Sequence, residues 1–429
     1  MKARVVVTGL GPIAPCGIGK ERFWAGIRSG KSFVKKLESF DVCDLDVRFK
    51  DVSEFQSQMV GMIDDFDKHA YGLNLQQLRR MDRFAQFAFV GSKLAIEDAG
   101  LCFDELNRER IGVCVGNAIA GAKRMNEEFE VLTELGEQQL SPLYAHPSLY
   151  MSSVPHVANV EIASHYKLHG PSTCISTGCT SGIDSVGYAK DLIENGVVDV
   201  MICGSVDAAI SPATLASFDV AGALAKRNHE PDKASRPFDA ERDGFVLAEG
   251  GGLMVLESLE HALKRNAVIY GEVLGFGTCM NAYHMTSLQK EGEDLARAME
   301  ISIEKSNIKH EDIGYINAHG SSTPQNDSCE TGAYKRVFGD LAYKIPISST
   351  KSVVGHSMGG ASSMEIVVCV LGIYDNYLPP TINYSVPDEY CDLDYIPNVG
   401  RDVSYDVALT TASGFSGIHS SMVLRRYKG

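Results

Sequence analysis

The chain has 429 residues, with 55 acidic against 40 basic side chains and a formal net charge of −15. This acidic balance disfavours general binding to nucleic acids or to anionic membranes, although it leaves room for a local basic patch. The 11 cysteines include no CxxC pair and no Cys/His cluster at zinc spacing, which is typical of reduced thiols in the cytoplasm. Glycine and proline interrupt the N-terminal stretch, so we expect no signal peptide, no long apolar span and a cytoplasmic location.

The first elements along the chain are expected to be a strand, a glycine-rich turn and a helix. Residues 4–7 form a β-branched run that ends in TGLGP, and helical spacing follows at 21–27. Pro12 and Pro15 stand where a phosphate-binding helix would begin, which disfavours a dinucleotide site. A long amphipathic helix is expected over residues 78–100, ended by its terminal glycine.

A turn of small residues around Cys179 lies between an expected buried strand, STCIST, and a helix. Ile183, Val186 and Ala189 recur at helical spacing after the turn. Cys179 therefore stands at the start of a helix, where unsatisfied backbone N–H groups and the helix dipole favour the thiolate. The alternative is a buried structural cysteine, but the glycines on both sides favour a reactive one.

The second half of the chain repeats this order of elements. DIGYINAHGSST echoes RIGVCVGNAIAG, and the strand, glycine-rich turn and apolar helix that begin at Pro346 parallel the stretch around Cys179. We therefore predict an α/β protein with two duplicated βαβ-rich halves, residues 1–260 and 261–429. The chemistry is expected where the two halves meet.

Two histidines in the second half follow predicted strands. His319 lies in NAHGSST and His356 in VVGHSMGG, and each adjoins a glycine that allows close approach of a ligand. Together with Cys179 they could bind a metal, but no carboxylate or second cysteine stands at matching short spacing. Nucleophilic catalysis fits better, because a thiolate can form a thioester and histidine N–H groups can stabilise an oxyanion.

Lys351 and Phe415 are further candidates in small-residue turns. Lys351 lies in SSTKS; if it is buried it needs a partner of opposite charge, and Glu365 lies one helix downstream. Phe415 lies in SGFSG, where glycine neighbours suggest that its backbone N–H or its ring comes near the reacting atoms.

In their order and spacing these motifs resemble the β-ketoacyl synthases of the thiolase superfamily. The likeness covers nearly the whole chain and rests on Cys179, NAHGSSTPQND, SSTKSVVGHSMGG and SGFSG. Shorter runs, such as STGCTSGIDSVGYA and NAYHMT, are similar to the catalytic ketosynthase subunits of type II aromatic polyketide synthases. The resemblance implies a thiolase-like fold whose two halves form a five-layer αβαβα core.

The activity that the resemblance implies is a decarboxylative Claisen condensation. Cys179 would accept an acyl chain from the phosphopantetheine arm of an acyl carrier protein, so the enzyme would need no cofactor of its own. His319 and His356 would bind the malonyl thioester and stabilise its enolate, with decarboxylation assigned to neither alone. The backbone N–H groups of Cys179 and Phe415 would form the oxyanion hole, and the Phe415 ring would gate entry.

Supporting roles are implied for residues around this centre. Lys351 with Glu365 would orient the histidines, and Ser321 and Thr323 would hydrogen-bond the pantetheine arm. Ser416 stands where fatty-acid members of the family usually have a glycine beside the gate. A side chain at this position restricts the φ angle and the flexibility of the loop more than glycine would.

The resemblance also implies two partners, an acyl carrier protein and a chain-length factor that forms a heterodimer with this chain. An acidic carrier protein needs a local basic surface, for which the candidates are Arg79, Arg80, Arg83, Lys123, Arg124, Lys226 and Arg227. One alternative is a fatty-acid elongation enzyme that uses the same residues. Another is a noncatalytic chain-length-factor-type subunit, which Cys179 disfavours because such subunits lack the nucleophile.

Overall fold

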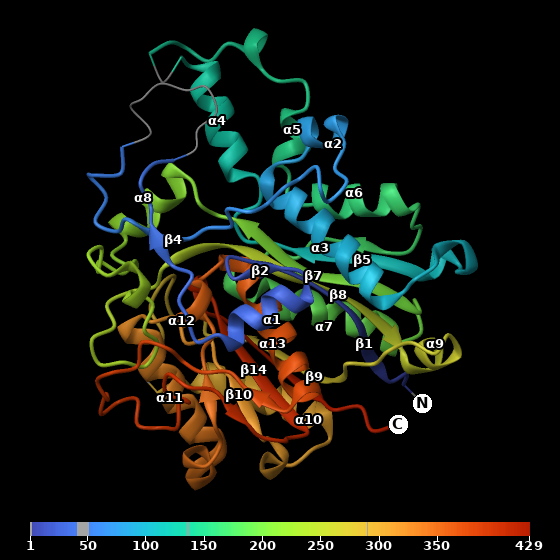
Figure 1. Cartoon of the computed structure of the whole chain (residues 1–429), viewed down its shortest axis with the longest axis vertical. Helices are drawn as coiled ribbons and strands as arrows, with labels where there is room; N and C mark the ends of the chain where they lie inside the picture. The colour runs from blue at the N-terminus through green and yellow to red at the C-terminus, as the bar shows by residue number, and fades with distance from the viewer. Residues whose placement is uncertain (1, 41–50, 135–136, 290) are drawn as a thin grey trace.

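The computed structural model describes residues 2–40, 51–134, 137–289 and 291–429. Within them, most strands belong to one large mixed sheet in the order β11-β10-β14-β15-β9-β1-β8-β7-β5-β6 (Figure 1). The sheet is folded so that helices lie against both of its faces and also between its two halves.

Each half of the sheet contributes five strands to this path. Those of the first half are β1 (Val5–Ala14), β5 (Ile111–Gly116), β6 (Ser172–Thr173), β7 (Val200–Ala208) and β8 (Leu247–Ser258). Those of the second half are β9 (Gly271–Met280), β10 (Tyr315–Asn317), β11 (Ile347–Ser348), β14 (Val407–Ser413) and β15 (Ile418–Arg425). The shorter strands are β2 (Gly17–Ile18), β3 (Lys35–Lys36), β4 (Met59–Gly61), β12 (Tyr377–Leu378) and β13 (Arg401–Asp402).

The two halves have the same topology. In the first, β5 is parallel to β6 and β7, while β8 is antiparallel to β7 and β1. In the second, β10 is parallel to β11 and β14, while β15 is antiparallel to β14 and β9. The halves join through β1 and β9, where Val6 lies opposite Glu272. This repetition supports the predicted duplication. The predicted boundary at residue 260 stays a prediction, and it falls within the short helix α9 (Leu259–Lys264).

Helices complete five layers (Figure 1). In order through the layers, they are α3 (Arg83–Ala99) and α6 (Val157–Tyr166) outside the first half, α7 (Ser181–Glu194) and α13 (Ala361–Asp375) between the halves, and α10 (Glu293–Ser306) and α11 (Pro324–Phe338) outside the second. The remaining α-helices are α1 (Lys20–Arg28), α2 (Leu75–Arg80), α4 (Ala122–Leu132), α5 (Leu149–Ser153), α8 (Pro212–Val220) and α12 (Lys351–Val354). The five-layer thiolase-like fold is thus confirmed.

The glycine-rich segment near the N-terminus is part of a strand. The sequence predicts a turn after residue 7, but β1 continues to Ala14 with one irregularity in its pairing to β8. A side chain at Gly11 would place its Cβ 1.9 Å from the carbonyl oxygen of Gly91 in α3. The glycines therefore allow a helix to pack directly on the strand, which is why they do not form a turn.

The helix predicted over residues 78–100 is two helices. The first, α2, ends at Arg80, and Asp82 caps the start of α3 by accepting from the backbone N–H of Arg83. Gly100 ends α3 in the left-handed conformation, with φ 62°, as expected for a C-terminal glycine. The apolar periodicity of the sequence continues across Met81 and Asp82, where α2 ends and α3 begins. Only Asp82, as a capping residue, marks this break in the sequence.

The central helix α13 is long and largely apolar. Residues Met358–Asp375 are long and apolar enough to cross a membrane by length and composition, with a mean hydropathy of 1.2. However, 89% of this stretch is buried inside the protein, as in the core helix of a folded domain. A helix between two sheets must be apolar on every side, so its length and composition are weak evidence for a membrane span.

Candidate active site

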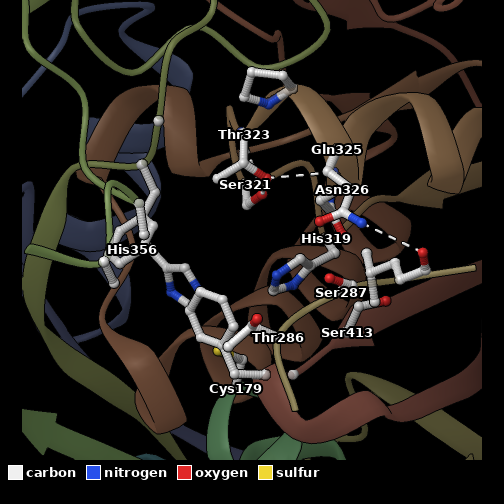
Figure 2. Close-up of a pocket in the computed structure, with 18 of the residues that line it drawn as sticks. Cys179, Thr286, Ser287, His319, Ser321, Thr323, Gln325, Asn326, His356 and Ser413 are labelled. Carbon is white, nitrogen blue, oxygen red and sulfur yellow. Dashed lines mark hydrogen bonds between the residues drawn. The ribbon is translucent and has the colours of Figure 1, made fainter. Parts of the chain in front are cut away.

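A cavity of about 310 Å³ lies where the two halves meet, and Cys179, His319 and His356 all line it (Figure 2). Cys179 precedes α7, His319 follows β10, and His356 follows α12. Three segments that are far apart in the sequence therefore deliver one side chain each to the same space. This is the meeting place of the halves that the sequence predicted for the chemistry.

The turn that carries Cys179 is held by the carboxylate of Asp184. Asp184 accepts from the hydroxyl of Thr177 at 2.5 Å and from that of Thr180 at 2.8 Å. Its other oxygen accepts from the hydroxyl of Ser420 in β15 at 2.6 Å. These bonds link the cysteine turn of the first half to a strand of the second.

The environment of Cys179 does not favour the thiolate in the free protein. Burial raises the pKa of the thiol to about 11, although the Lys351 ammonium and a hydrogen bond from the backbone N–H of Phe415 lower it. The N–H groups of Gly182 and Ile183 in the first turn of α7 donate to the hydroxyl of Ser362 in α13. The helix start was expected to lower the pKa of the Cys179 thiol. Burial of the thiol outweighs that effect, and the helix N–H groups of Gly182 and Ile183 bind Ser362 instead of the sulfur.

The two histidines lie close to the thiol and to each other. The sulfur of Cys179 and a ring nitrogen of each histidine lie within 4.8 Å of one another. The rings of His319 and His356 are nearly perpendicular, with centroids 5.3 Å apart. Burial first, and then the charge of Lys351, hold the pKa of both rings well below the usual value, so both are neutral at physiological pH.

Hydrogen bonds assign the same tautomer to both rings. The backbone N–H of Met358 donates to Nδ1 of His356 at 3.1 Å. The ammonium of Lys351, which is only a donor, lies 3.4 Å from Nδ1 of His319. Because each Nδ1 accepts, each neutral ring carries its proton on Nε2. The site therefore offers two N–H donors to an oxygen atom.

This tautomer is unsuited to a metal ion, although the three side chains are close enough to share one. A histidine that binds a metal usually donates its second ring N–H to a carboxylate or carbonyl. Here the second nitrogen of His319 and of His356 accepts instead, so Nε2 has no free lone pair. The Lys351 ammonium beside them also repels a cation. The donor set fits an anionic oxygen better than a metal.

Lys351 and Glu365 form the expected buried ion pair. The exposed fractions of the two side chains are 2% each, and the ammonium also donates to the carbonyl oxygen of His319 at 2.7 Å. The second carboxylate oxygen of Glu365 has no hydrogen-bond partner among the described residues, and burial raises the pKa of this group to about 7. The pair is thus attached directly to the turn that carries His319.

Sequence reasoning missed the carboxylate that fixes this turn. Glu330 in α11 accepts from the backbone N–H groups of His319 at 2.7 Å and Gly320 at 2.8 Å. It also accepts from the hydroxyls of Tyr334 and Thr411. A glutamate on one face of a helix carries no sequence signal for this role, because its partners come from other elements.

Phe415 lies at the cavity as expected. The residue is 40% exposed, and its ring stacks on Phe218 of α8 with centroids 6.0 Å apart. Its backbone N–H donates to the sulfur of Cys179. The side chain of Ser416 lies outside the described parts of the chain.

Ser321 and Thr323 lie together at the cavity wall. Their hydroxyls are 2.8 Å apart, and Thr323 also caps α11. Figure 2 shows Thr286 and Ser287 near the same space; they come from the segment after β9 and were not among the candidates. The NAYHMT run ends at Thr286, and Ser287 follows it directly, so the motif was visible although its contact with the cavity was not.

Comparison with known proteins defines the class. The family model of the β-ketoacyl synthase N-terminal domain matches residues 2–262, and that of the C-terminal domain matches residues 270–385. The chain belongs to the β-ketoacyl synthase family, and it is therefore an enzyme of the acyltransferase class.

Relatives from two branches of this family are similar over their full length. The tetracenomycin polyketide synthase ketoacyl synthase alpha subunit of Streptomyces glaucescens is 42% identical, with 99% of this chain and 97% of the relative covered. The 3-oxoacyl-[acyl-carrier-protein] synthase 2 of Coxiella burnetii is 41% identical, with 99% of each chain covered.

Two solved structures have the same fold over 100% of both chains. One is a type II polyketide synthase acyl-carrier protein in complex with its ketosynthase bound to the hexaketide, with a TM-score of 0.91 and 39% identity. The other is the ishigamide ketosynthase/chain length factor, with a TM-score of 0.90 and 32% identity.

Proposed function

We propose that this chain is the ketosynthase subunit of a type II polyketide synthase, which condenses malonyl-acyl carrier protein with an acyl chain on Cys179. The observation that carries the proposal is the convergence of one buried thiol and two Nε2–H donors in one cavity. Full-length similarity to polyketide ketosynthase alpha subunits supports it.

The first step loads the acyl chain. The sulfur of Cys179 attacks the thioester carbonyl of the acyl carrier protein, a new carbon–sulfur bond forms, and the bond to the pantetheine sulfur breaks. The thiol proton ends on the released pantetheine thiol. The backbone N–H of Phe415, which donates to the sulfur in the free enzyme, turns to the carbonyl oxygen and stabilises the oxyanion together with the N–H of Cys179. One such donor contributes about 3 kcal/mol.

The second step creates the nucleophile. Nε2–H of His319 and of His356 donate to the thioester carbonyl oxygen of the malonyl unit, which stabilises the enolate as carbon dioxide leaves. The enolate carbon then attacks the thioester on Cys179, so a carbon–carbon bond forms and the carbon–sulfur bond breaks. The leaving thiolate of Cys179 takes a proton from water, and the chain is longer by two carbons.

The substrate arrives on a carrier protein rather than as a free molecule. The solved ketosynthase in complex with its acyl-carrier protein supports this mode of delivery. The phosphopantetheine arm then extends past Ser321 and Thr323, whose hydroxyls line the cavity. The enzyme needs no cofactor of its own for these steps, and a cytoplasmic location stays a prediction.

A heterodimer with a chain-length factor is proposed on three grounds. A similar solved structure is a ketosynthase/chain length factor, and β6 ends the large sheet as an open edge. In the same half of the chain as β6, the segment from α4 to α5 exposes several apolar side chains: Met125, Phe129, Leu143, Tyr144 and Tyr150. Exposed apolar groups of this kind mark interaction surfaces. A stable, fully active homodimer would count against the heterodimer.

The test is to incubate the chain, alone and with a candidate chain-length factor, with malonyl-acyl carrier protein. We expect poly-β-keto products only with the partner, and a mass increase on Cys179 after acyl loading. One-step elongation of long saturated acyl chains to 3-oxoacyl products by the chain alone would instead establish the fatty-acid function, which the 41% identity to a 3-oxoacyl synthase also supports. If Cys179 is never acylated, the chain is a noncatalytic subunit.

A further inference from the structure

A buried carboxylate outside the catalytic group collects four backbone donors beside the cavity. Asp207 in β7 is 0% exposed. One of its oxygens accepts from Ile119 and Ala120 at 2.9 and 3.1 Å, and the other accepts from Ala118 and Gly359 at 2.8 Å each. Burial raises the pKa of Asp207 to about 6, so it is ionised at neutral pH and can accept all four bonds.

Two side chains of β7 bind both backbone groups of Gly359, its carbonyl oxygen and its N–H. Ser205 and Asp207 lie two residues apart in β7, so their side chains point to the same face. The hydroxyl of Ser205 donates to the carbonyl oxygen of Gly359 at 2.6 Å, while Asp207 accepts from its N–H. A Cβ at Gly359 would lie 2.7 Å from the Asp207 carboxylate, so the contact requires glycine.

The residue before this glycine is strained and controls His356. Met358 has φ 52°, a left-handed conformation that a long side chain adopts at a cost. In this conformation its backbone N–H donates to Nδ1 of His356. Strain of this kind persists only where surrounding contacts hold it, and Asp207 and Ser205 hold the next residue.

We propose that Asp207 is a positioning residue that, with Ser205, fixes the turn after His356 and thereby sets the Nε2–H tautomer of that histidine. The role of His356 as a donor rests on the proposed function, but its tautomer does not. The same carboxylate also fixes the segment 118–120, which packs near Cys179 in the first half. Asp207 thus links the segment beside Cys179 to the turn after His356 through hydrogen bonds to both.

The experiment compares Asp207→Asn and Ser205→Ala with the wild type by nitrogen NMR of ¹⁵N-histidine-labelled protein. The His356 signal is identified as the one lost in His356→Ala. We expect one Nε2–H tautomer in the wild type and a mixture of tautomers in Asp207→Asn. The asparagine amide has only one oxygen, so its NH₂ group must face two of the four backbone N–H groups, and those two hydrogen bonds are lost. Ser205→Ala removes one bond to the same turn and acts as the milder second variant.

Kinetics provide the second readout. We expect Asp207→Asn to lower condensation kcat about 100-fold, the scale of a small misplacement of a reacting group, with KM for the carrier protein unchanged. The control is Glu257→Gln, which alters a buried carboxylate of β8 that is bonded to Thr8 and Arg265 instead of the cavity.

Each outcome bears on the proposal. A single unchanged tautomer in both variants overturns it. So does a loss of kcat in Glu257→Gln as large as that in Asp207→Asn, since the effect is then general instability. If the wild type performs no condensation, the proposed function fails, but a tautomer mixture in Asp207→Asn still supports the positioning role.

Discussion

The ammonium of Lys351 lies 2.7 Å from the carbonyl oxygen of His319 and 3.4 Å from Nδ1 of the same residue. A single cation therefore fixes both the backbone and the ring of this histidine. Glu365 balances the charge from α13, so the whole arrangement is buried without an unpaired ion. The tautomer of His319 follows from this contact.

Removing Lys351 should damage stability and catalysis in separable ways. Lys351→Ala leaves Glu365 buried without a partner, which we expect to lower the free energy of unfolding by about 3–5 kcal/mol. Lys351→Met with Glu365→Leu should recover most of that loss, because neither charge remains buried. Condensation should stay low in the double variant, since Nδ1 of His319 has lost its donor. Denaturant unfolding and kcat measure the two effects; a fully active double variant would contradict this role.

The reactivity of Cys179 should rise steeply with pH. Because its thiol has a pKa of about 11, the thiolate fraction increases about tenfold per pH unit between pH 7 and 9. Alkylation of the free enzyme by iodoacetamide, followed by intact mass, should show the same slope, and Cys179→Ala should remove this site of modification. A rate that is already constant above pH 7 would mean that the thiolate is present in the resting enzyme.

The histidines should be needed for condensation but not for acyl loading. Replacing His319 or His356 by alanine should lower condensation by about 10²- to 10⁴-fold. Loading of Cys179 should persist, because the oxyanion donors of that step are backbone groups. Carbon dioxide release and the mass of the acyl-enzyme separate the two steps. His229→Ala is the control, because the side chain of His229 is 75% exposed. Equal losses of acyl loading and condensation in the His319 or His356 variants would argue against a role confined to condensation.

The ring of Phe415 should limit access to the thiol. Phe415→Ala removes the ring that stacks on Phe218 but keeps the backbone N–H that donates to the sulfur. We expect faster alkylation of Cys179 by a bulky maleimide and little change with the small iodoacetamide. Phe218→Leu should act in the same direction, since it removes the support of the ring. An unchanged maleimide rate would exclude a gating role.

Among the basic residues proposed for carrier-protein docking, Lys226 lies beside the cavity. Arg80, Arg83, Arg124 and Arg227 are engaged in ion pairs with carboxylates of this chain. Lys226 is exposed, and its backbone N–H donates to Asp243, which lines the cavity.

Reversing the charge at Lys226 should weaken docking. Lys226→Glu should raise KM for malonyl-acyl carrier protein about fivefold, equivalent to about 1 kcal/mol, with kcat unchanged. The effect should diminish at high salt. Lys428→Glu is the control, because it reverses an exposed charge near the C-terminus, where Lys428 pairs with Asp406. An unchanged KM for Lys226→Glu would place the docking surface elsewhere.

The sequence by itself determined the order of elements, the duplication and the residues of the centre. These signals are local: Cys179, His319 and His356 each lie beside glycine in a turn between regular elements, and periodicity reveals the elements. The break between α2 and α3 and the course of β1 were missed, because packing of a helix on a strand overrides what a short run of glycines indicates.

Only the tertiary structure decided the protonation of the site. The high pKa of Cys179 comes from burial between the two halves, and the histidine tautomers come from donors on Met358 and Lys351. Asp207 and Glu330, which hold the two histidine turns, are ordinary acidic residues in the sequence. Their roles depend on contacts between distant segments, and burial makes those contacts decisive because water no longer competes for the same donors.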